Sequence, residues 1–156
     1  MAHAYWRIKY VTAQNGGASV IAEVEFRGTS GGSTLTTGGT AIGDSDQSGF
    51  EFAKAFDANN DATQWFSNSV GSNSWIGYHF SSPVDVVEVA LYAHGVYGPS
   101  SFNVDYSDDG SSWTTLWFVS STDAAAWISG GGLGVWTYSA PAAPIVHARL
   151  KHYLRR

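Results

Sequence analysis

The chain has 156 residues, of which 44% are hydrophobic, so it is long enough for one domain with its own core and too short for two ordinary ones. Its net charge is −5, it has no cysteine, and no lysine or arginine lies between Ala55 and Ala148. These features exclude disulfides and argue against nucleic-acid binding, which depends on basic side chains.

No apolar run approaches the roughly 18 residues that span a bilayer, and the start of the chain lacks a basic segment followed by an apolar one. We therefore expect no membrane insertion and no signal peptide.

Short segments in which apolar and polar residues alternate predict an all-β fold. Residues 5–11 place Trp6, Ile8 and Tyr10 on one side, and residues 21–27 repeat the pattern. Residues 28–49 are rich in Gly, Ser and Thr, which predicts a long loop with room for one short strand at 33–37. Further strands are predicted at 74–80, 85–93, 101–107, 113–119, 134–140 and 145–154. We expect about eight strands in one antiparallel β-sandwich of the jelly-roll type, with residues 145–156 as a basic terminal strand or tail.

Two connections carry further signals. Asp109-Gly110 is a dipeptide favoured in tight hairpin turns, where both central positions need a positive φ. Residues 120–134 read as a loop, because Gly and Ser interrupt any alternation there.

The segments "KAFDANNDATQW", "WIGYHFSSPVDVVEVAL" and "GPSSFNVDYSDDGSSW", taken in this order, resemble the discoidin or coagulation factor 5/8 type C family, a galactose-binding-like jelly roll. The resemblance covers about residues 50–120. In that family an Ala-Glu-hydrophobic-Glu strand, preceded by an aromatic-Arg strand, usually closes the domain, whereas here "YWRIKY" and "IAEVEFRG" open it. A jelly roll whose termini lie close together accepts such a permutation. The arrangement also resembles modules of bacteriophage virion and tail proteins.

The oxygen-rich segment that begins at Asp57 is a candidate cation site. It imitates the first half of an EF-hand loop, but the sixth position is Ala62 where Gly is needed and the twelfth is Asn68 where Glu is needed. An EF-hand is thereby excluded. Calcium in another geometry stays open, because it accepts carboxylate, amide, hydroxyl and carbonyl oxygens together.

The family resemblance implies a structural calcium ion at this segment. By motif, its ligands would be the Asp57 carboxylate, the Thr63 hydroxyl, backbone carbonyls near Lys54 and near Asn59 or Asn60, and the Glu23 carboxylate. The alternative is a metal-free loop in which Asp57 and Asn59 form Asx-turns and Thr63 bonds the backbone.

Carbohydrate recognition is predicted in neighbouring loops. Trp65 and Trp75 could stack on sugar rings, but their positions after a turn and at the start of a strand are more typical of the core. Better candidates combine aromatic surfaces with short polar groups, as shallow sugar sites do. These candidates are His94, Tyr97, Asn68, Asn73 and Trp127. Each taken alone also fits an ordinary surface loop.

Catalytic motifs are missing from the sequence. It contains no Gly-x-Ser-x-Gly, no His-Glu-x-x-His and no phosphate-binding glycine loop. Asp105, Asp108 and Asp109 could supply paired carboxylates, although Asp108 and Asp109 suit the hairpin turn better. We therefore expect a protein that is not an enzyme.

The sequence leads to two functional hypotheses. The first is a non-catalytic carbohydrate-binding adhesion module on a phage or phage-like particle, where many copies recognise a cell-surface glycan. The second is a structural virion protein, such as a decoration, spike-base or tail component, that uses the jelly roll to bind other virion proteins. Both hypotheses place the protein at a virion or extracellular surface, and the second allows a homo-oligomer.

Overall fold

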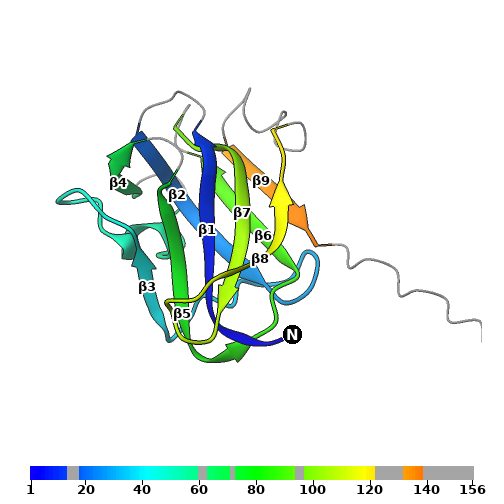
Figure 1. Cartoon of the computed structure of the whole chain (residues 1–156). Helices are drawn as coiled ribbons and strands as arrows, with labels where there is room; N and C mark the ends of the chain where they lie inside the picture. Colours follow the sequence, from blue (N-terminus) through cyan, green and yellow to red (C-terminus); the bar gives the residue numbers. More distant parts are fainter. Residues whose placement is uncertain (14–17, 60–62, 71–72, 94–96, 122–131, 139–156) are drawn as a thin grey trace, which may run out of the picture.

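The computed structural model describes residues 1–13, 18–59, 63–70, 73–93, 97–121 and 132–138, and these contain nine strands and one short 3-10 helix (Figure 1). Five strands form one sheet in the order β3-β5-β1-β7-β8, and four form the other in the order β4-β2-β6-β9. Every pairing is antiparallel. The elements are β1 (His3–Ala13), β2 (Ala18–Arg27), β3 (Thr40–Gly43), η1 (Phe52–Ala55), β4 (Trp65–Val70), β5 (Trp75–Val84), β6 (Glu88–Ala93), β7 (Pro99–Ser107), β8 (Thr114–Val119) and β9 (Gly132–Thr137).

This architecture confirms the predicted all-β antiparallel sandwich of the jelly-roll type. The strand positions differ from the prediction in two places. Residues 33–37 contain only an isolated bridge between Arg27 and Thr34, and the short strand lies at 40–43 instead. Residues 65–70 form β4, which the sequence did not predict because "WFSNSV" is too polar to alternate clearly. The predicted strand at 145–154 lies outside the described residues.

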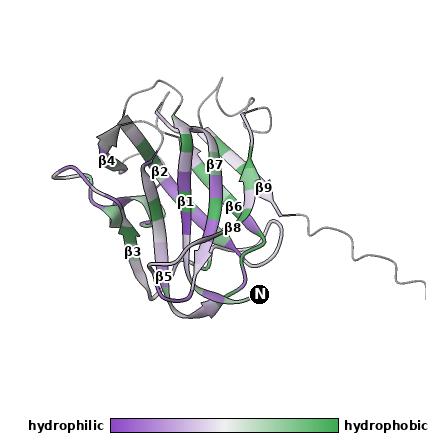
Figure 2. Ribbon diagram, viewed as in Figure 1, coloured by the Kyte–Doolittle hydropathy of each residue, from purple (hydrophilic) through white to green (hydrophobic). Residues whose placement is uncertain are grey.

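The core lies between the two sheets and is built by alternation along the strands. In β1, Trp6, Ile8 and Tyr10 are fully buried, and in β2 Val24 and Phe26 are fully buried. In Figure 2, green and purple stretches follow one another along β1. Both strands hold central positions, since β1 pairs with β5 and β7 while β2 pairs with β4 and β6. The two segments at the start of the chain therefore provide the middle of each sheet.

The strand directions divide the sandwich into two ends (Figure 1). The strands β1, β4, β6 and β8 finish at one end, and the strands that follow them, β2, β5, β7 and β9, start there. We call this the loop end. The opposite end, which we call the N-terminal end, carries the start of β1 and the connections β5–β6 and β7–β8.

The connection between β7 and β8 is longer than the predicted tight turn. It runs from residue 108 to 113, and Gly110 has a φ of +72° while Asp109 keeps a negative φ. Asp109 organises this loop instead, because one carboxylate oxygen accepts hydrogen bonds from the Ser111 and Ser112 amides, each at 2.7 Å. The bonds from the Ser112 and Ser111 amides hold the pKa of Asp109 well below its usual value.

Candidate functional site

The predicted sugar-contacting residues that the structure describes all lie at the loop end. Asn68 lies in β4, Asn73 precedes β5, and Tyr97 precedes β7. His94 and Trp127 lie outside the described residues, in the connections that follow β6 and β8. The three described positions, Asn68, Asn73 and Tyr97, thus belong to one end of the sandwich.

Backbone hydrogen bonds connect this end to the central strands. The Tyr10 amide donates to the Ser74 carbonyl (2.9 Å), and the Val20 amide donates to the Tyr97 carbonyl (3.1 Å). Tyr97 and Asn73 are exposed. Asn68 is exposed as well, and its side-chain amide donates to the Asp46 carbonyl. Polar groups and an aromatic ring are therefore presented to solvent from a rigid sheet framework, as a shallow binding surface requires.

The predicted cation loop is ordered around Asp57. The Thr63 hydroxyl donates to both oxygens of the Asp57 carboxylate (2.9 and 2.8 Å), and the Asn59 amide donates to one of them (3.1 Å). The intervening Ala58 has a φ of +59°, a left-handed conformation that costs energy for a residue with a Cβ. The loop therefore holds the Asx-turn geometry of the metal-free alternative, with its oxygens gathered at one place.

Glu23 reaches this loop from the middle of β2. The residue is only 3% exposed, and within the described part of the chain its buried Oε2 atom has no hydrogen-bond partner. Burial and the nearby negative charge of Asp57 raise the pKa of Glu23 to about 7, although the Asn59 and Ala58 amides act in the opposite direction. The register shift between Ile21 and Glu23 in the β2–β6 pairing accompanies this burial.

These residues fit a calcium ion in their chemistry. A buried carboxylate oxygen without a partner is costly unless a cation or donor meets it, and the surrounding donors are the hard oxygens that calcium prefers. Among the described residues, no three His, Cys, Asp or Glu side chains are grouped so that they could hold a metal ion by themselves. Hydroxyl and carbonyl oxygens would therefore complete the shell, among them those of Thr63 and of Lys54 at the end of η1. Asn60 lies outside the described residues.

The two tryptophans considered for stacking have different surroundings. Trp65 is fully buried, and its indole N–H donates to the Ser45 carbonyl (2.9 Å), so the expectation of a core residue is confirmed. For Trp75 the same expectation is wrong, because its ring is half-buried on the outer face of the five-stranded sheet. There the Arg7 guanidinium lies 5.3 Å from the centre of the Trp75 ring and 4.1 Å from that of Trp113.

The acidic residues considered for catalysis serve the fold. Asp105 is 2% exposed and accepts from Arg7 Nε (2.9 Å) and from the Thr115 hydroxyl (2.7 Å). Asp108 does not support the turn as predicted, since its carboxylate lies 2.9 Å from the Nδ1 atom of His3. The partnerships of Arg7 and His3 were not predicted from the sequence. The alternation of β1 places Arg7 on the outer face, but no local pattern indicates its partners.

The fold and the loop end together define a β-sandwich binding module. A model of the F5/8 type C domain matches residues 38–125, more than half of the chain, and the chain belongs to this family. No curated protein and no solved structure is significantly similar to it. Domains of this family are generally non-catalytic and bind carbohydrate or protein ligands. Within the part of the chain that the structure describes, no helix is long and apolar enough to cross a membrane.

Proposed function

We propose that this protein is a glycan-binding adhesion module whose loop end contacts sugars on a cell surface. The observation that carries the proposal is the position of Asn68, Asn73 and Tyr97 at one end of a sandwich whose family binds carbohydrate or protein ligands. Exposed amides and a phenol ring supply the hydrogen bonds and the stacking surface that a pyranose ring uses.

The proposed setting is a phage or phage-like particle. A shallow, solvent-exposed site gives weak binding, and display of many copies raises the overall avidity by about 10²–10⁴ without new contacts.

The position of β1 and β2 ahead of the matched residues 38–125 supports the proposed permutation of the family's terminal strands.

A glycan array probed with the protein displayed multivalently tests the sugar proposal. Asn73→Ala and Tyr97→Ala should weaken binding, whereas Thr114→Ala, an exposed position where β8 starts at the N-terminal end, should leave it unchanged. Absence of binding at millimolar sugar with multivalent display would contradict the proposal.

We also propose that Glu23, Asp57 and Thr63, with carbonyls near Lys54 and near Asn59 or Asn60, hold a structural calcium ion. The ion would supply positive charge to two neighbouring carboxylates and would link β2 to the loop that precedes β4. Calorimetric titration with calcium, compared between the parent protein and Glu23→Gln, tests this directly. Equal heats in both proteins would contradict the ligand set.

A structural virion protein is the second candidate, and the edge strands β8 and β9 favour it. Phe118 is 51% exposed, Leu133 49% and Val135 44%. A groove of about 310 Å³ runs between the two edges and is lined by Trp117, Trp136 and neighbouring residues. No described strand pairs with the outer edge of β8 or of β9. Apolar side chains on such edges are typical of surfaces that bind another protein.

Light scattering coupled to size-exclusion chromatography separates the two candidates. A stable oligomer that Phe118→Ser and Val135→Ser convert to a monomer, with no effect on glycan binding, supports assembly through this groove. A monomer in the parent protein that binds sugar through Tyr97 supports the adhesion module alone.

A further inference from the structure

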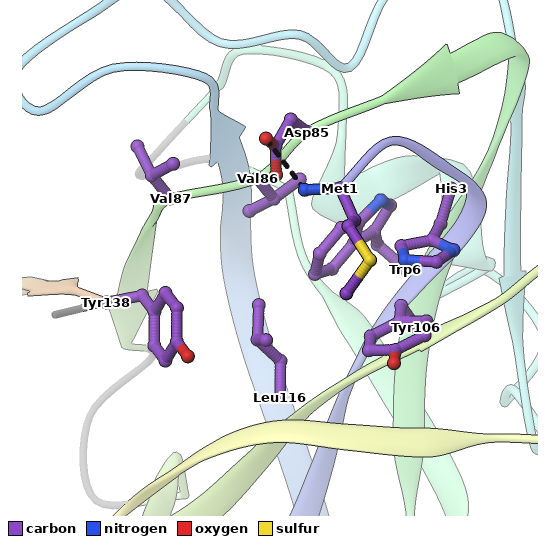
Figure 3. Close-up of a pocket in the computed structure, with 9 residues that line it drawn as sticks. All are labelled: Met1, His3, Trp6, Asp85, Val86, Val87, Tyr106, Leu116 and Tyr138. Atoms are coloured by element: carbon purple, nitrogen blue, oxygen red, sulfur yellow. Dashed lines mark ion pairs between the residues drawn. The ribbon is translucent and has the colours of Figure 1, made fainter. Parts of the chain in front are cut away.

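A cavity of about 310 Å³ lies at the N-terminal end of the sandwich, opposite the loop end. Figure 3 shows the side chains that line it, which come from the start of β1, the β5–β6 connection, β7, β8 and the residue that follows β9. The walls that matter here are His3, Trp6, Val86, Tyr106, Leu116 and Tyr138. None of these residues belongs to the proposed glycan site or to the proposed calcium site.

The cavity has a rigid aromatic wall. Trp6 is fully buried, and its indole N–H is already satisfied by the Val84 carbonyl (3.1 Å). The His3 imidazole stacks on the Tyr106 ring at a centroid distance of 3.8 Å and an interplanar angle of 16°. Its ring centre also lies 5.8 Å from that of Trp6, in an edge-to-face arrangement. The position of the imidazole is therefore determined by packing and does not depend on a ligand.

His3 presents one polar atom to this apolar space. The residue is 8% exposed, and its Nδ1 atom lies 2.9 Å from the Asp108 carboxylate. A carboxylate only accepts, so Nδ1 carries the hydrogen and Nε2 of the neutral ring is an acceptor. Nε2 is buried and has no hydrogen-bond partner among the residues that the structure describes. In Figure 3 this side of the ring is turned toward the cavity. The ring is thus oriented by Asp108 and lacks a donor on its other side.

The walls select the chemistry of a ligand. No lysine or arginine is among the described residues that line the cavity, and the N-terminal ammonium of Met1, which does line it, is paired with Asp85 (2.9 Å). Asp108 lies beside His3, so an anion would meet no unpaired positive charge. A sugar would bury several hydroxyl groups against Val86, Leu116 and aromatic rings, at a cost of about 1–3 kcal/mol for each hydroxyl without a partner. A neutral ring with a single hydroxyl group avoids both costs.

The size of the cavity agrees with this class of ligand. A cavity of about 150 Å³ already holds a benzene ring, so the present volume accommodates one ring with a short substituent. We propose that this cavity binds a phenol-like molecule whose hydroxyl group donates a hydrogen bond to Nε2 of His3, while the ring packs against Trp6, Leu116 and Tyr138.

Phenol and toluene are the matched probes, because they have nearly the same shape and only phenol has a hydroxyl group. Each is titrated into the full chain while the nitrogen resonances of the His3 ring and the indole of Trp6 are followed by NMR. Phenol should bind roughly three- to tenfold more tightly than toluene, the ratio that one neutral hydrogen bond supplies. It should also shift the Nε2 resonance of His3.

Two variants complete the test. Leu116→Trp fills the cavity and should abolish the binding of both probes, and His3→Phe should remove the preference for phenol while toluene still binds. If His3→Phe fails to fold, the phenol-to-toluene ratio in the parent protein decides alone. Equal affinities for the two probes, unchanged binding in Leu116→Trp, or no shift at about 20 mM phenol, which would nearly saturate a site with a Kd of about 1 mM, would each overturn the proposal. Glycan binding at the loop end should be the same in Leu116→Trp and the parent protein.

Discussion

Replacement of Glu88 by glutamine should remove a polar contribution of several hydrogen bonds at the outer face of the four-stranded sheet. Glu88 is 2% exposed, and its carboxylate accepts from Arg27 (2.8 Å), the Ser30 hydroxyl (2.8 Å), the Gly31 amide (3.1 Å) and the Thr137 hydroxyl (3.0 Å). These donors come from β2, the following loop and β9. One carboxylate therefore joins three parts of the chain to β6.

The pKa of Glu88 gives the size and the sign of the effect. Burial alone would raise this pKa, but the hydrogen bonds from Arg27, Ser30, Gly31 and Thr137 outweigh it and lower the pKa from 4.5 to about 2. The folded state thus holds its proton less tightly than the unfolded state. The stabilisation is complete above the unfolded value of 4.5 and is lost as the pH falls toward 2. A gap of roughly 2.5 between the two pKa values corresponds to about 3 kcal/mol.

Urea unfolding followed by tryptophan fluorescence, at several pH values from 7 to 2.5, measures this contribution. At pH 7, Glu88→Gln should lower the free energy of unfolding by about 3 kcal/mol, and the difference from the parent protein should shrink as the pH falls below 4.5. Glu25→Gln is the matched control, because Glu25 contacts the same Arg27 (2.6 Å) without the other donors. Parallel stability curves for Glu88→Gln and the parent across this pH range would refute the reasoning.

Three further predictions concern the calcium loop and the outer sheet face. In EDTA at pH 8, the free energy of unfolding of Glu23→Gln should exceed that of the parent by on the order of 2–3 kcal/mol, because a pKa of about 7 means that the buried Glu23 carboxylate is charged at this pH at a cost in stability. Added calcium should make the parent the more stable protein. A parent that is already more stable in EDTA would contradict this prediction. Ala58→Gly should raise the free energy of unfolding by up to about 1 kcal/mol, and with it the thermal midpoint, since glycine adopts the left-handed φ without strain. A lower midpoint would count against strain at this position. Asp105→Ala should lower the free energy of unfolding by about 3 kcal/mol in urea because it leaves Arg7 unpaired, and a loss below 1 kcal/mol would show that the pair adds little.

The sequence by itself determined the fold class and most of the core. Alternation is a local property, readable within a few residues, and it placed Trp6, Ile8 and Tyr10 correctly inside the sandwich. Alternation did not predict β4, because the residues of this strand are too polar to alternate clearly. This segment forms a strand because the fold places it beside β2, with which it pairs. The order of motifs also identified the family, because their joint spacing is more specific than any one of them.

Only the tertiary structure decided which polar groups meet. By alternation alone Glu23 would face solvent, yet it is buried beside Asp57, a proximity that the family resemblance implied and the local pattern did not. His3 and Asp108 are 105 positions apart, and no local pattern connects them. Such partnerships depend on strand register across two sheets, which is set by the sum of many contacts and not by the residues involved. The cavity beside His3 arises in the same way, from five separate segments that converge at one end of the sandwich.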